Sequence, residues 1–241
     1  MADKVALVIG AGDATGGAIA RRFAKEGYVA CMTRRHADKL EPLVRHIEAE
    51  GGKARGFGND ARKEEQMIAL FEEIERDIGE IEVAVYNIGA NVNFPIRETT
   101  SRVFFKVWEM ACFGGFLMGR EAAKVMVPRK RGTIIFTGAT ASLRGASGFS
   151  AFSAGKHALR AVAQSMAREL GPEGIHVAHV VIDGAIDTAF IREMFPERYK
   201  LKERDGILDP GQVAENYWYL HNQDRSAWTH EMDLRPWIEK F

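Results

Sequence analysis

Apolar residues in this chain gather in short runs that lack the polar alternation of a half-exposed strand. Such runs predict strands buried on both faces, here over residues 5–9, 28–32, 54–57, 83–88, 133–137 and 175–182. Between the first four runs, apolar residues recur at helical spacing: Ile19, Phe23 and Ala24; Leu40, Leu43, Val44 and Ile47; Met67, Leu70, Phe71 and Ile74. This alternation predicts an α/β fold, a doubly wound parallel sheet with helices on both faces.

Two segments depart from the alternation. Residues 189–209 follow the sixth predicted strand and mix aromatic with charged residues, which indicates a substrate loop or lid before the helix signal at Pro210. The tail from Ser226 carries Trp228 and Trp237. These large aromatic side chains predict that the tail packs on the rest of the domain or on a neighbouring subunit. No repeat or linker interrupts the pattern, so we expect one domain over residues 1–241.

Composition limits the classes of partner. Thirty-three Lys and Arg balance 33 Asp and Glu, so no excess positive field favours nucleic acid or an anionic membrane. The two cysteines, Cys31 and Cys112, make no disulfide framework and favour a reducing, cytoplasmic location. The opening apolar run is too short for a signal sequence or a membrane span.

His176 and His179 face opposite sides of a predicted strand, so no metal site is expected.

A glycine-rich turn joins the first predicted strand to a helix that we expect to begin near Ala18. Its residues are Gly10, Gly12, Asp13, Ala14, Thr15 and Gly16. The N–H groups of such a turn, at the positive end of a helix dipole, can hold a pyrophosphate. The placement in the first strand–helix–strand unit favours a dinucleotide site over the alternative, a tight turn without a ligand.

The end of the second predicted strand bears on the choice of dinucleotide. An NAD site usually offers a carboxylate to the ribose 2′-hydroxyl there. This chain has Thr33, Arg34 and Arg35 instead, and guanidinium groups suit a 2′-phosphate. The residues therefore favour NADP. NAD remains the alternative, because Asp13 would repel the phosphate if its carboxylate faced it.

The sequence resembles the classical short-chain dehydrogenase/reductase family over nearly its whole length. Gly10, Ala14 and Gly16 match the family's glycine loop, and 86–89 (Tyr-Asn-Ile-Gly) match its Asn-Asn-Ala-Gly turn. The resemblance implies a Rossmann fold that binds a nicotinamide cofactor. It further implies cofactor contacts for residues after the third, fourth and sixth strands: Asp60 at the adenine, Asn87 and Gly89, and Gly184 and Thr188 at the nicotinamide amide.

The family's catalytic centre is a Tyr-x-x-x-Lys pair, a Ser thirteen residues before the Tyr, and an Asn on the helix after the fourth strand. The resemblance places Lys156 on the lysine, which can still bind the nicotinamide ribose. Phe152 stands at the tyrosine position, Ala139 at the serine position and Ala111 at the asparagine position. Since a positioned acid or base contributes about 10² to 10⁴ in rate, carbonyl reduction by the family's usual route should be severely slowed.

Other polar side chains near these positions could replace the missing groups. Ser142 is the best candidate, because it lies shortly after the fifth strand, at the mouth where open α/β sheets bind ligands. Ser150 and Ser153 are better explained by helix capping and solvation in the first turn. His157 points about 100° away from Lys156 around the helix, which favours packing or the surface.

Two functions follow from these residues. One is an NAD(P)-dependent oxidoreductase with an atypical proton relay, acting on a small substrate whose apolar pocket includes Phe94, Phe149, Phe190 and Phe195. The alternative is a catalytically silent protein of the same fold that binds or senses NADP(H). The redox function is favoured by Lys156, Asn87 and Thr188, which the resemblance places at the nicotinamide end of the cofactor. A protein that only senses the cofactor needs contacts with the adenine and the phosphates alone. The resemblance also implies a homodimer or homotetramer.

Overall fold

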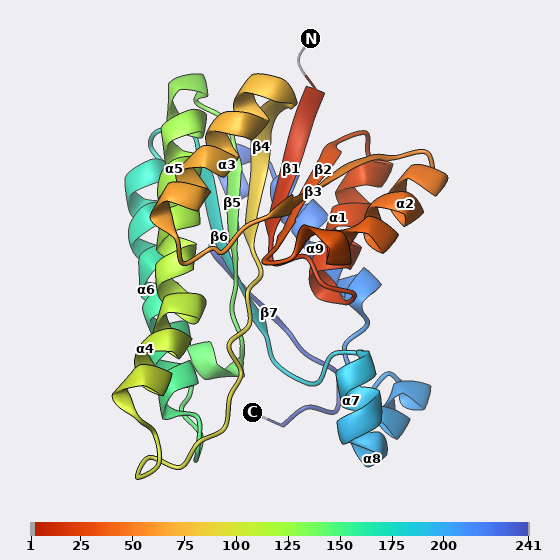
Figure 1. The fold of residues 1–241 in the computed structure, drawn as a ribbon, viewed down its shortest axis with the longest axis vertical. Coiled ribbons are helices and arrows are strands. Elements are labelled where there is room, and N and C mark those ends of the chain that lie inside the picture. Colours follow the sequence, from red (N-terminus) through yellow and green to blue (C-terminus); the bar gives the residue numbers. More distant parts are fainter. Residues whose placement is uncertain (1–2, 241) are drawn as a thin grey trace.

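The computed structural model describes residues 3–240 and contains one seven-stranded sheet in the order β3-β2-β1-β4-β5-β6-β7 (Figure 1). Every neighbouring pair of strands is parallel. The strands are β1 Asp3–Ile9, β2 Val29–Arg34, β3 Lys53–Gly58, β4 Gly79–Tyr86, β5 Thr133–Thr137, β6 His176–Ile182 and β7 Glu231–Leu234. The doubly wound α/β fold predicted from the apolar runs is confirmed.

Helices cover both faces of the sheet. Figure 1 places α1, α2 and α9 on one side of the sheet, and α3, α4, α5 and α6 on the other. The α-helices are α1 Thr15–Lys25, α2 Glu41–Ala49, α3 Glu64–Asp77, α4 Ser101–Trp108, α5 Gly114–Met126, α6 Ser150–Leu170, α7 Ala189–Met194, α8 Pro196–Tyr199 and α9 Pro210–His221. Short helical turns are η1 Ala37–Leu40, η2 Glu109–Phe113, η3 Val127–Arg129, η4 Thr140–Ser142, η5 Lys200–Arg204 and η6 Arg225–Ala227.

Two apolar layers form the core, one on each face of the sheet. In β4, Val83 and Val85 pack into the layer under α1 and α9, whereas Ala84 and Tyr86 pack into the layer under α3, α5 and α6. Successive residues of a strand point to opposite faces, and the central strands are therefore buried on both sides, as their apolar runs predicted. Among the described residues, no helix is both long and apolar enough to span a membrane.

β3 and β7, the two edge strands, differ from the sequence prediction. β3 is not buried on both faces, because it lies at the edge of the sheet and only Ala54 in it is fully buried. β7 was not predicted as a strand, since its four residues are half polar. It pairs in parallel with β6, which confirms that the tail after Ser226 packs on the body.

The segment predicted as a loop over residues 189–209 is largely helical. α7, α8 and η5 follow one another there, and α9 begins at Pro210 with Asp209 as its N-cap. Charged residues interrupt the apolar spacing in these short helices, which hides their period from the sequence. Figure 1 shows α7 and α8 beyond the carboxyl ends of the strands, beside the C-terminal segment.

Candidate active site

The glycine loop lies at the carboxyl end of β1 and is packed too tightly for side chains at two positions. Gly10 has a φ of +90°, and a Cβ atom there would lie 2.8 Å from the side chain of Ile88. A Cβ on Gly16 would lie 2.6 Å from the carbonyl oxygen of Gly10 and 2.8 Å from the amide nitrogen of Asn87. Asn87 also donates a hydrogen bond to Gly10 O (3.1 Å). The loop therefore holds its shape through backbone packing.

The first turn of α1 has donors without partners, as a phosphate site requires. The helix begins at Thr15, so the prediction of a start near Ala18 was three residues late. Its N-cap, Ala14, provides no side-chain acceptor. The buried Thr15 hydroxyl has no hydrogen-bond partner among the described residues. Because the first N–H groups of a helix need acceptors, this turn fits the pyrophosphate of a dinucleotide.

A cavity of about 270 Å³ opens beside this turn, at the carboxyl ends of β1, β2 and β4. Seven of the predicted cofactor residues line it: Gly10, Gly12, Arg34, Arg35, Asp60, Asn87 and Gly89. Thr33, which the sequence analysis grouped with Arg34 and Arg35, lines it as well. The remaining lining residues were not singled out from the sequence: Ala11, Asn59, Ala61, Arg62, Ile88 and Met110. For all of these except Met110, which lies in η2, the signal would have been their position at or shortly after the end of a predicted strand.

Guanidinium groups outnumber carboxylates at the outer end of this cavity. Arg62 holds Asp60 by two hydrogen bonds (2.9 and 2.5 Å), and these bonds lower the pKa of the Asp60 carboxyl. Asp13 is exposed and faces Arg34, with 3.6 Å between Oδ1 and Nη1. Arg35 is exposed and has no carboxylate within ion-pair distance among the described residues. The end of β2 can therefore receive an anion, with Asp13 as its competitor.

Lys156 lies deep between α6 and the ends of β4 and β5. Its ammonium donates hydrogen bonds to Thr137 O (2.8 Å) and Ile88 O (3.2 Å), and its side chain is buried. Burial lowers the pKa of this ammonium to about 8. An ammonium carries three donors, so one N–H remains for a ligand beside the 87–89 turn.

The three positions that the resemblance matches to the family's Tyr, Ser and Asn lie together in one apolar cluster. Phe152, Ala111 and Ala139 all belong to it, with Val107 and Phe149 among their neighbours. The Phe152 ring centroid is 6.0 Å from Lys156 Nζ. No proton donor stands where the tyrosine would be, because phenylalanine fills that place.

A π-helical turn, η2, brings Ala111 into this cluster. Such turns insert one residue into a helix and are frequent at functional sites. The Tyr86 hydroxyl donates to Met110 O (2.6 Å) within the turn. Gly155 of α6 lies so close that a Cβ on it would be 2.7 Å from the Ala111 Cβ. Helical periodicity could not reveal this turn, since it disturbs the period by a single residue.

The hydroxyl groups of the three candidate serines are buried. Ser142 is fully buried, and its hydroxyl accepts a hydrogen bond from Ala139 N (3.1 Å), so it holds η4 in shape. The prediction that Ser150 and Ser153 cap α6 was wrong: the N-cap is Phe149, and both hydroxyls are buried without a partner among the described residues. His157 is exposed, as expected.

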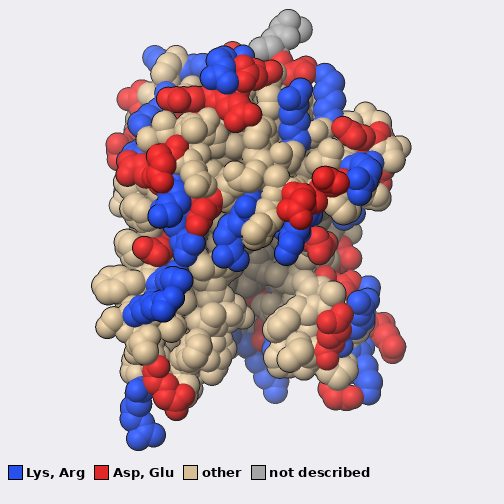
Figure 2. Space-filling view, viewed as in Figure 1, with Lys and Arg blue, Asp and Glu red and all other residues tan. Residues whose placement is uncertain are grey.

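Gly184 and Thr188 lie on the segment between β6 and α7. Gly184 has a φ of +149°, and a Cβ there would lie 2.7 Å from Pro236 in the C-terminal segment. Thr188 caps α7, because its hydroxyl accepts a hydrogen bond from Ile191 N (3.1 Å). Neither residue lines the glycine-loop cavity. Figure 2 shows this face hollowed between the α4 side and the α7 and α8 side, with mostly uncharged walls.

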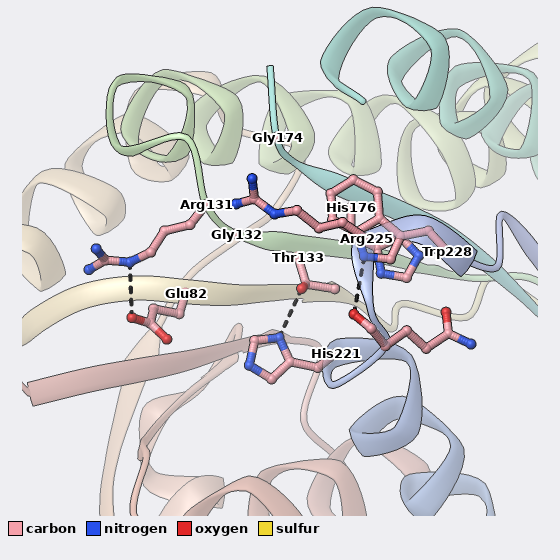
Figure 3. Close-up of a pocket in the computed structure, with 10 residues that line it drawn as sticks. Glu82, Arg131, Gly132, Thr133, Gly174, His176, His221, Arg225 and Trp228 are labelled. Carbon is pink, nitrogen blue, oxygen red and sulfur yellow. Dashed lines mark hydrogen bonds and ion pairs between the residues drawn. The ribbon is translucent and has the colours of Figure 1, made fainter. Parts of the chain in front are cut away.

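A second cavity, of about 170 Å³, lies at the opposite ends of β4, β5 and β6 (Figure 3). Several of its polar groups pair with one another, whereas the buried His176 Nδ1 has no hydrogen-bond partner among the described residues. Glu82 accepts from Arg131 Nε (3.2 Å), and Thr133 shares a 2.8 Å hydrogen bond with His221. The ring of Trp228 stacks on His176 and its N–H donates to a backbone carbonyl. Among residues 3–240, no group of three metal-ligating side chains occurs here or elsewhere. This cavity therefore offers less unpaired chemistry than the glycine-loop cavity.

Comparison with known proteins agrees with the fold. Residues 4–198 match the family model described as short chain dehydrogenase. A crystal structure of a short-chain dehydrogenase from Rhodopseudomonas palustris is 49% identical, with a TM-score of 0.82 over 97% of this chain and 99% of that one. The 3-oxoacyl-[acyl-carrier-protein] reductase of Bos taurus is 29% identical over 88% of this chain and 90% of its own. A metagenomic short-chain oxidoreductase in complex with NADP, 23% identical, covers 99% of both chains with a TM-score of 0.81.

Proposed function

The chain belongs to the short-chain dehydrogenase family of oxidoreductases, and from this premise we propose that it moves hydride between NADP(H) and a small apolar substrate. The proposal includes a proton relay that differs from the family's. Lys156 is the observation that carries it. A buried ammonium with one free N–H, placed beside the 87–89 turn, is useful to a protein that holds a nicotinamide ribose.

Each part of the cofactor has residues that fit it. The first turn of α1 and the Thr15 hydroxyl would receive the pyrophosphate. Arg34 and Arg35 would pair with a 2′-phosphate, which supports NADP over NAD. Lys156 would hold the nicotinamide ribose, with Gly184 and Thr188 near the amide. When bound, the nicotinamide supplies or accepts the hydride.

The apolar walls support the proposed substrate class. Phe190 and Phe195 on the α7 side are exposed, and Phe94 is exposed on the opposite side. Exposed aromatic side chains at the rim of a recess usually mark a binding surface. The apolar cluster around Phe152 continues this surface inward. A polar substrate such as a sugar would leave its hydroxyl groups unpaired there.

One observation favours the alternative, a catalytically silent NADP(H)-binding protein. All three altered catalytic positions are packed with apolar side chains, as in a core. The same packing also suits an apolar substrate that lies against Phe152.

The proposed assembly is a homodimer or homotetramer, which the exposed Phe105 and Phe116 on the α4 and α5 side support.

The test is a titration followed by a substrate screen. Isothermal calorimetry with NADPH and NADH should show tighter binding of NADPH. NADPH consumption should then appear with apolar ketones or aldehydes and be absent with sugars. Tight binding without any turnover would favour the silent alternative. Binding of neither dinucleotide would contradict both functions.

A further inference from the structure

Asp183 is a buried carboxylate at the carboxyl edge of the sheet that the family's chemistry leaves unexplained. It directly follows β6, and only 1% of it is exposed. Val177, six residues earlier, packs with Leu159 of α6. Since alternate residues of a strand share a face, Asp183 points to the side of the sheet that carries Lys156 and Phe152. A carboxylate withdrawn from water there is costly unless it has partners or a task.

The partners of Asp183 come from the turn that carries the altered serine position. The Thr140 hydroxyl donates a 2.5 Å hydrogen bond to Asp183 Oδ1. Arg144 lies 3.7 Å from the same oxygen. The other oxygen, Oδ2, is buried and has no hydrogen-bond partner among the described residues. The carboxylate is thus hydrogen-bonded to one hydroxyl and paired with one guanidinium through Oδ1, while Oδ2 is left without a partner among the described residues.

Thr140 lies on the turn beside the apolar cluster around Phe152. It directly follows Ala139, which packs in the cluster around Phe152. Unlike Ser142, which is fully buried, Thr140 is partly exposed. The Thr137 hydroxyl, three residues earlier, is buried against Tyr217. In the turn after β5, Thr140 therefore combines access to solvent with a buried carboxylate behind it.

We propose that Thr140 and Asp183 form the proton relay of this protein, with Thr140 in contact with the substrate and Asp183 acting through it. The inference rests on the proposed function. In alcohol oxidation, the alcohol proton passes to Thr140 Oγ1 as the Thr140 proton passes to Asp183 Oδ1. A bound NADP⁺ would accept the electron pair of the substrate C–H bond as hydride, which leaves the substrate as a carbonyl compound. After product release, the proton returns through Thr140 to solvent. Reduction is the reverse.

Three variants test the relay. Thr140→Val keeps the shape and removes the hydroxyl, Thr140→Ser restores a hydroxyl, and Asp183→Asn keeps the shape and removes the base. Thr133→Val is the matched control, because Thr133 is another hydrogen-bonded threonine, at the opposite end of β5 from the turn that carries Thr140. NADP⁺ reduction is followed with 1-phenylethanol, cyclohexanol and 1-tetralol. NADPH affinity and thermal unfolding are measured for each protein.

We expect Thr140→Val and Asp183→Asn to lower kcat about 10² to 10⁴-fold, the usual contribution of a positioned acid or base. KM and the Kd for NADPH should stay within about twofold, and Thr140→Ser should recover most of the lost kcat. Independently of turnover, ¹³C-aspartate NMR of the protein without cofactor should show one carboxyl signal that Asp183→Asn deletes. That signal should shift in Thr140→Val and stay in place in Thr133→Val.

The possible failures separate the relay from the proposed function. Unchanged kcat in Thr140→Val, or equal losses in Thr140→Val and Thr140→Ser, would overturn the relay while leaving the oxidoreductase intact. A wild-type protein that binds NADPH but oxidises none of the alcohols would also overturn it. Failure to bind NADPH at all would instead overturn the proposed function.

Discussion

The two halves of the carboxyl edge are built on different principles. Around β1 and β2, the glycine loop presents backbone N–H groups, a Thr15 hydroxyl without a hydrogen-bond partner among the described residues, and the guanidinium groups of Arg34 and Arg35. Around β5 and α6, the surface is an apolar cluster with one buried ammonium, Lys156. The first half is shaped by backbone packing, and the second by side chains.

This difference explains how one half can change without the other. A glycine loop depends on close backbone approaches, so few substitutions are tolerated at Gly10 or Gly16. A proton relay depends on individual side chains, so replacing Tyr by Phe alters the chemistry and leaves the fold in place. Binding of a dinucleotide and handling of a proton are therefore separable properties of this architecture.

The difference between the two halves should shrink most when a proton donor is introduced into the apolar half. Phe152→Tyr with Ala139→Ser places a phenol four residues before Lys156 on the same helix face and adds a second donor for a substrate oxygen. We expect reduction of simple ketones and aldehydes to rise about 10² to 10⁴-fold, measured as NADPH consumption.

The control for this double variant is Phe152→Leu with Ala139→Ser, which lacks the phenol. It should show no gain. If the restored pair binds NADPH yet reduces no carbonyl in a broad panel, the apolar half has been rebuilt for another purpose. If the wild type already reduces such carbonyls at ordinary rates, another group supplies the proton, and the Thr140 and Asp183 variants become the deciding experiment.

The glycine-loop half should respond most sharply at Gly16. Gly16→Ala forces a Cβ within 2.6 Å of Gly10 O and 2.8 Å of Ala11 Cα. Both contacts are backbone, so we expect a loss of about 1 to 3 kcal/mol of stability and about 10²-fold weaker NADPH binding. Gly12→Ala is the structural control, because its Cβ would meet only Arg34 Nη2 at 3.6 Å. Equal denaturation midpoints for the two variants would contradict the packing argument.

Much of this architecture could be predicted from the sequence, and the misses have physical causes. Apolar runs identified the central strands, because strands buried on both faces exclude polar residues. β7 was missed because an edge strand of four residues needs no apolar pattern. Gly10 and Gly16 were recognisable from the loop spacing alone, since their role depends on the backbone.

The candidate relay was harder to find than the cofactor site. The resemblance to the family assigned no role to Asp183, so the family's motifs did not point to it. Its signal was a charged residue directly after an apolar strand, at the edge where ligands bind. The contact with Thr140 joins residues 43 apart in sequence, and only the parallel pairing of β5 with β6 brings them together.

Lys156 is the buried ammonium of the apolar half, and the pH dependence of its charge sharpens the comparison. Burial lowers its pKa from 10.5 to about 8. Between these values the unfolded chain holds a proton that the folded protein has released, so this residue makes stability rise with pH over that window. The contribution is up to about 3 kcal/mol. The free energies of unfolding of wild type and Lys156→Met, compared at pH 7 and 9.5, should diverge in favour of the wild type as pH rises. A constant difference would show that the ammonium is not disfavoured by burial.

The smallest expected effect concerns the outer end of the cofactor cavity, where Arg34 and Arg35 lie at the carboxyl end of β2 and contact solvent. Arg34→Ala with Arg35→Ala should weaken NADPH binding about tenfold or more, since charge-assisted hydrogen bonds contribute about 1.5 to 3 kcal/mol. NADH binding should change little, because NADH lacks the 2′-phosphate. Asp13→Asn should do the opposite by removing the carboxylate that faces Arg34. Arg45→Ala, on the exposed face of α2 and paired with Glu41, controls for loss of surface charge. If the double variant weakens both dinucleotides equally, the arginines serve the adenosine generally and the preference for NADP has no basis in them.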